Sequence, residues 1–84
     1  MSDYPTDLSQ LTGLGLVRLF LKAANRPHTT PIERAEFFDF KARVFATLAE
    51  RDGNPDAATA AARARSDRDR LLLEIEAENG GEVR

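Results

Sequence analysis

The side chains that could do chemistry are few and scattered. His28 is the only histidine, and it falls in a short stretch between two predicted helices. Nucleophilic catalysis needs a base and an orienting group around the nucleophile, and Ser2, Ser9 and Ser66 stand in no motif of that kind. We therefore interpret His28 as a surface loop residue and predict that the protein is not an enzyme.

Two pairs of acidic residues have helical spacing. Glu33 and Glu36 are three residues apart, and Glu74 and Glu78 are four apart. Carboxylate sites in helix bundles also use a Glu-x-x-His element, which this sequence does not contain, and there are no cysteines. We interpret the pairs as solvated helix faces and expect neither a metal site nor a cofactor.

An arginine-rich run, Arg63 to Arg70, resembles a nucleic-acid contact. However, its charges can pair with acidic residues four positions further along a helix. These pairs are Arg63 with Asp67, Arg65 with Asp69, and Arg70 with Glu74. A net charge of −2 and a pI near 5.3 also disfavour a phosphate-backbone binder. A small DNA-binding regulator remains the alternative, with this run or Arg18, Lys22 and Arg26 at the contact.

Residues that favour the starts and ends of helices divide the chain into three segments. Thr30-Pro31-Ile32-Glu33 has the pattern of a capping box with proline at the first helical position. Asp52-Gly53-Asn54-Pro55 can end one helix at Gly53 and begin the next at Asn54. Asp7, with Gln10 three residues later, is a weaker start signal. We predict helices over about 7–25, 31–52 and 55–78, with 79–84 as a flexible tail.

Small and large side chains alternate along the second and third helices with spacings of three and four, the pattern of a coiled-coil seam. Folding the chain back at Gly53 predicts an antiparallel hairpin in which large residues face small ones. The seam residues are Phe38, Ala42, Phe45, Ala61, Ala64, Arg68 and Leu71. Arg68 is the charged member, so we expect it to pair with Asp39 or to stack on Phe38 and to fix the register; an anion site is the alternative.

A second apolar stripe on the middle helix requires its own partner, and the first helix, which is apolar around most of its circumference, is the obvious candidate. One neighbouring helix cannot cover that much surface, so we predict a homodimer or another protein partner. The predicted interface consists of Leu16, Val17, Leu19, Phe20, Phe37, Phe40, Val44 and Leu48.

Together these patterns predict one small all-α domain over residues 1–84, arranged up-down-up with a C-terminal antiparallel hairpin. Surplus apolar surface without a catalytic constellation favours a protein–protein interaction module, a small adaptor or regulator that self-associates. Ten arginines against two lysines, with thirteen alanines, indicate a GC-rich bacterial genome. The longest apolar stretch is too short to span a bilayer, so we expect no membrane partner and a cytoplasmic location.

Overall fold

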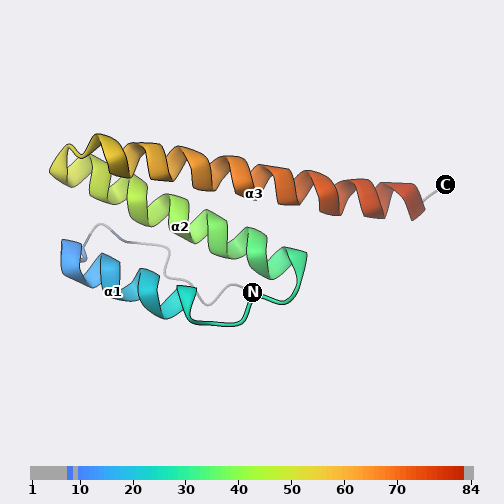
Figure 1. The fold of residues 1–84 in the computed structure, drawn as a ribbon, viewed down its shortest axis with the longest axis horizontal. Coiled ribbons are helices and arrows are strands. Elements are labelled where there is room, and N and C mark those ends of the chain that lie inside the picture. The colour runs from blue at the N-terminus through green and yellow to red at the C-terminus, as the bar shows by residue number, and fades with distance from the viewer. Residues whose placement is uncertain (1–7, 9, 83–84) are drawn as a thin grey trace.

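The computed structural model describes residue 8 and residues 10–82, and the side chains of 79–82 are left aside. In that part of the chain the protein is all-helical, which confirms the predicted class. The three helices are α1 (Gly13–Ala24), α2 (Pro31–Asp52) and α3 (Pro55–Glu82) (Figure 1).

The first helix begins later than the sequence predicts. Its N-cap is Thr12, whose hydroxyl accepts a hydrogen bond of 3.0 Å from the backbone N–H of Gly15. The start signal at Asp7 lies outside the described residues, and Leu8 and Leu11 contribute from a non-helical segment. The prediction of a helix from about residue 7 is therefore wrong.

The other helix boundaries follow from local capping. Glu33 donates its backbone N–H to the Thr30 hydroxyl at 3.1 Å, and its carboxylate accepts the Thr30 backbone N–H at 3.0 Å. Gly53 ends α2 in the left-handed conformation, with φ of 61°. The Asn54 carboxamide oxygen then accepts the Asp56 backbone N–H at 2.9 Å. At its other end α3 runs to Glu82, past the predicted end near residue 78.

Helix α2 lies between α1 and α3, and α3 runs back along it (Figure 1). The contact between α2 and α3 buries alanines from both helices, which lets the two backbones approach closely. These alanines are Ala35, Ala42, Ala57, Ala61 and Ala64. No Cα atom of α1 lies within 8 Å of a Cα atom of α3, so the described helices form a single layer.

The larger apolar core lies between α1 and α2. Leu16 of α1 and Phe40 and Val44 of α2 are almost fully buried there, together with Leu8 and Ala23. The Arg51 guanidinium donates a hydrogen bond to the Leu11 carbonyl and ties the segment before α1 to the end of α2. These contacts bury Phe40 and Val44, from the second apolar stripe predicted on this helix, within the chain itself.

A single layer of helices leaves the molecule elongated. The radius of gyration is 14.2 Å, whereas a compact chain of this length has about 12 Å. The accessible surface is 5952 Å², against about 5,000 Å² for a compact monomer of this mass.

Candidate interaction surface

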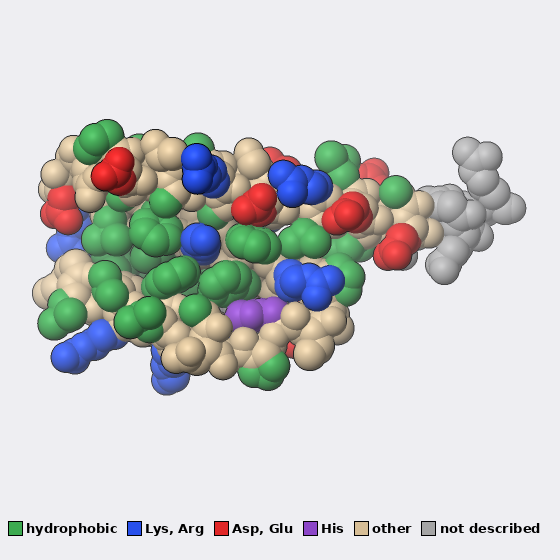
Figure 2. Space-filling view, in the orientation of Figure 1, with side chains coloured by type: hydrophobic (Ala, Val, Ile, Leu, Met, Phe, Trp, Pro, Cys, Tyr) green, Lys and Arg blue, Asp and Glu red, His purple; other side chains and the backbone are tan. Residues whose placement is uncertain are grey.

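The side of α1 that points away from α2 is apolar. Leu14, Val17 and Leu21 are 62%, 42% and 53% exposed, whereas Leu16 and Ala23 of the same helix are buried. Spacings of three and four residues place the exposed side chains on one stripe. We call Leu14, Val17, Leu21 and the exposed Ala24 the α1 stripe. Figure 2 shows hydrophobic side chains along α1 and along the band between α1 and α3.

Four half-buried phenylalanines continue this surface across α2. The ring centroid of Phe20 lies 5.9 Å from that of Phe37 and 5.4 Å from that of Phe45, and Phe37 lies 5.7 Å from Phe38. The Lys41 ammonium lies 6.0 Å from the Phe20 ring and 5.9 Å from the Phe38 ring, within cation–π range. Phe45, which we predicted to lie in the seam between the second and third helices, thus packs on α1 as well.

The structure divides the predicted interface residues into three groups. Leu16, Phe40 and Val44 are at most 1% exposed and lie in the α1–α2 core, so a second molecule cannot contact them directly. Leu19, Phe20, Phe37 and Leu48 pack against that core and remain half-buried. Val17 alone is openly exposed. The sequence prediction was wrong for the first group because α1 and α2 cover each other.

Two exposed residues that complete the α1 stripe, Leu14 and Leu21, were missing from the predicted interface. Their spacing from Val17 was the available signal. Arg18 and Lys22 are exposed on the adjacent side of the same helix. Residues 10–32 contain no aspartate or glutamate, so the formal charges within this stretch of the sequence are positive.

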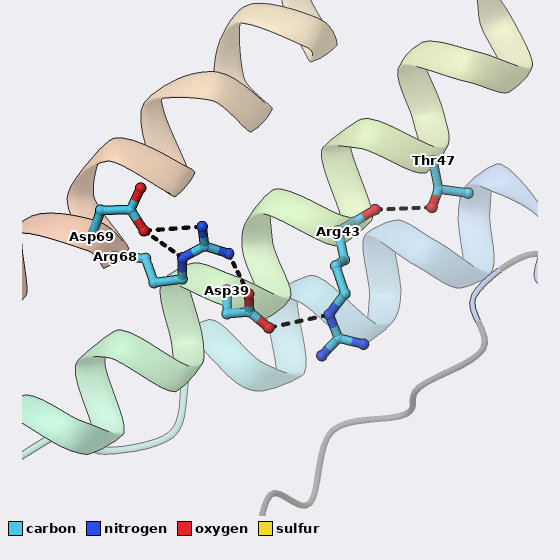
Figure 3. A network of polar contacts seen from close by, with 5 residues as sticks. All are labelled: Asp39, Arg43, Thr47, Arg68 and Asp69. Atoms are coloured by element: carbon cyan, nitrogen blue, oxygen red, sulfur yellow. Dashed lines mark hydrogen bonds and ion pairs between the residues drawn. The ribbon is translucent and has the colours of Figure 1, made fainter. Parts of the chain in front are cut away.

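The predicted pairing of Arg68 with Asp39 is confirmed. The Arg68 guanidinium lies 2.6 Å from one oxygen of Asp39, and Arg43 lies 3.4 Å from the other (Figure 3). Arg68 also contacts Asp69 of its own helix at 3.0 Å. Hydrogen bonds to Asp39 and then Asp69 raise the pKa of Arg68 above its ordinary value.

This network lies in an open groove of about 430 Å³ between α2 and α3, with Ile32 and Leu72 exposed at its sides. Asp39 bridges two arginines, and Arg68 binds two carboxylates. Since carboxylates already occupy the Arg68 guanidinium, the contacts support the register role and not the anion site.

The arginine-rich run pairs differently from the prediction. Arg70 contacts Asp67 at 3.6 Å, three residues back, instead of Glu74. Within the described residues, no ion pair joins Arg63 to Asp67 or Arg65 to Asp69. The prediction of three spacing-four pairs was therefore wrong, although Arg68 and Arg70 are both bound by carboxylates.

His28 is not a free surface residue. Its ring centroid lies 4.6 Å from that of Phe37, and the side chain is half-buried. It therefore packs at one end of the phenylalanine cluster, contrary to the surface-loop interpretation.

Comparison with known proteins finds no matching family model, no matching curated protein and no matching solved structure.

In the described part of the chain, no helix combines the length and hydrophobicity needed to cross a membrane. No three histidine, aspartate or glutamate side chains of that part gather as a possible metal site.

Proposed function

We propose that this chain is a non-enzymatic protein–protein interaction module that self-associates, with the homodimer as its working form. The observation that carries the proposal is the α1 stripe, where Leu14, Val17 and Leu21 are each more than two-fifths exposed. Large apolar side chains that are exposed side by side on successive turns of one helix are typical of a protein contact surface. The half-buried phenylalanine cluster extends that surface onto α2.

The architecture supports the same proposal. Stable domains bury apolar faces between two packed layers of secondary structure, whereas the helices described here form one layer. A second copy would supply the missing layer.

In this proposal the hairpin of α2 and α3 acts as the rigid support. We infer an up-down-up arrangement with a coiled-coil-like seam, in which the buried alanines set a close approach and the Arg68–Asp39 pair fixes the register. The adaptor or regulator would work in the cytoplasm, with an additional protein partner as its target.

A matched pair of variants tests the proposal. Leu21→Asp places a charge on the α1 stripe, and Leu73→Asp places one on α3, where Leu73 is 65% exposed. Because both sites are open to solvent, both variants should fold, and circular dichroism checks this. Light scattering after gel filtration should give a monomer mass for Leu21→Asp and a dimer mass for Leu73→Asp. Equal masses for the two variants would contradict the proposed surface.

The second candidate, a small DNA-binding regulator, is favoured by one observation. Arg18 and Lys22 are exposed together in a stretch without acidic residues. In contrast, Arg68 and Arg70 of the arginine-rich run are held by carboxylates. A salt-dependent gel shift that is lost in Arg18→Glu would support this role over self-association.

A further inference from the structure

We propose that the groove between α2 and α3 binds a basic amphipathic helix of a partner protein, with a lysine or arginine of that helix paired to Glu36 and an aliphatic side chain one turn away packed against Ile32 and Leu72. This inference rests on the proposed role as a protein–protein interaction module, and it specifies the chemistry of the partner. It does not depend on the α1 stripe or on self-association.

The groove has the length of a short helix. On α2 it is lined along residues 32, 36, 39 and 43, whose spacings of four and three place them on one stripe. A helix advances about 16 Å over that stretch. The opposite wall comes from α3, with Arg68, Asp69 and Leu72, and about 430 Å³ of open space lies between the walls. A trough of this kind between two packed helices can receive the side chains of a third helix.

The part of the groove near the start of α2 is apolar. Ile32 is 59% exposed and Leu72 is 48% exposed, whereas Ala35, which lines the same groove, is buried. Two large exposed side chains from neighbouring helices, with a small buried residue in the same lining, form a contact site for an aliphatic side chain. This part of the groove therefore supplies the apolar half of the proposed contact.

The charges in the groove determine which partner fits. Three carboxylates, of Glu36, Asp39 and Asp69, and two guanidiniums, of Arg43 and Arg68, line it. Asp39 pairs with both arginines, and Arg68 also pairs with Asp69 (Figure 3). In contrast, Glu36 is half-buried and forms no ion pair with another described residue. The charge of the groove that has no counter-charge is therefore negative and lies on Glu36.

A basic helix is the partner that satisfies this carboxylate. Glu36 lies one turn after Ile32, so a helix that sets an aliphatic side chain against Ile32 brings a residue three or four positions away to Glu36. A wholly apolar helix would cover Glu36 without a partner for its charge, which is costly. An acidic helix would have to displace Asp39 and Asp69 from Arg68 and would be repelled by Glu36. Charge complementarity thus favours lysine or arginine at this point.

The experiment measures the binding of labelled synthetic helices by fluorescence anisotropy. The probe is an alanine-based peptide of about four turns that carries leucine and lysine one turn apart on one face. Control peptides have glutamine or glutamate in place of the lysine. The wild-type protein should bind the lysine peptide most tightly and the glutamate peptide most weakly.

Variants of Glu36 test the ion pair. Glu36→Gln should weaken binding of the lysine peptide about two- to fivefold, the range of a partly exposed ion pair. Glu50→Gln removes an exposed glutamate of the same helix outside the groove and should leave binding unchanged. Glu36→Lys should reverse the preference, so that the glutamate peptide binds more tightly than the lysine peptide. Circular dichroism checks that each variant is folded.

A second matched pair tests the apolar half of the contact. Leu72→Asn removes an aliphatic side chain from the groove, and Leu73→Asn makes the same change at the next residue, which is 65% exposed and lies outside the groove. Leu72→Asn should weaken binding of the lysine peptide about fivefold through the loss of buried apolar area. Leu73→Asn should bind as the wild type does.

Equal binding of the lysine and glutamate peptides would overturn this inference, as would binding that Glu36→Gln and Leu72→Asn leave unchanged. No binding of the lysine peptide at about 1 mM would overturn it as well. Leu21→Asp, which alters the α1 stripe, should bind this peptide as tightly as the wild type. A dimeric wild type without peptide binding would refute the groove alone, whereas a monomeric wild type with the expected binding pattern would refute self-association alone.

Discussion

Replacing Ala61 by leucine tests the close approach of α2 and α3. Ala61 is 2% exposed and lies among other buried alanines of the two helices. With free space available, three added carbons would stabilise the fold by about 0.8 kcal/mol each. The alanine contact leaves no such space, so we expect overpacking to lower the free energy of unfolding by about 1–3 kcal/mol. The direction in which the free energy of unfolding changes therefore shows whether the contact between α2 and α3 is tightly packed.

The matched control is Ala62→Leu, one residue further on the solvent side of α3. Leucine and alanine have similar helix propensities, so this variant should stay within about 0.5 kcal/mol of the wild type. Urea unfolding followed by circular dichroism measures both, at one fixed protein concentration because self-association makes the apparent stability of a protein depend on its concentration. In thermal melts each kcal/mol corresponds to about 4–8 °C for a domain of this size. If Ala61→Leu matched its control or raised stability, the close packing of the hairpin would be refuted.

The remaining predictions concern capping, charge and the turn. A double-mutant cycle on Arg68 and Asp39 should give a coupling of about 0.5–1 kcal/mol, since both side chains are partly exposed; additive effects would show that the pair does not stabilise the register. Thr30→Ala should cost about 1 kcal/mol of unfolding free energy through loss of the α2 cap. Hydrogen bonds from Thr30 and then Thr29 lower the pKa of Glu33 from its ordinary value of 4.5, so its stabilisation is present above that pH and is lost as pH falls through the lowered pKa. Glu33→Gln should remove that part of the pH dependence of the melting temperature. Gly53→Ala should destabilise by about 1 kcal/mol, because φ there is 61° and alanine is disfavoured in that conformation.

The sequence predicts the class and the second and third helices well because their signals are local. The capping box at Thr30 and the Gly53–Asn54 junction each involve residues within one turn of each other. The start of α1 was predicted wrongly because several polar residues before the apolar run can act as the N-cap of a helix. The structure has Thr12 in that position. Leu8 and Leu11 then pack on the core from outside the helix, a tertiary contact that no local signal specifies. The helix end near residue 78 was also wrong, since two glycines disfavour a helix without obliging it to stop.

The candidate site was harder to predict for a related reason. Periodicity indicates which residues share a stripe but not what covers it. The outer stripe of α2 and the inner side of α1 cover each other, which buries Leu16, Phe40 and Val44. The sequence indicated that α1 partners this stripe but not which side of α1 faces α2, so it did not identify the residues left exposed on the opposite side. The Arg68–Asp39 pair was predictable because a charge on an apolar seam restricts its partners to the adjacent turn of α2.

The most direct test of self-association is the mass of the wild-type protein by sedimentation equilibrium at micromolar concentration. We expect twice the 9.3 kDa mass of the chain, with the dimer fraction falling on dilution as mass action requires. A mass of one chain at every concentration up to about 100 micromolar would contradict the account, since an interface of standard size is expected to hold at that concentration.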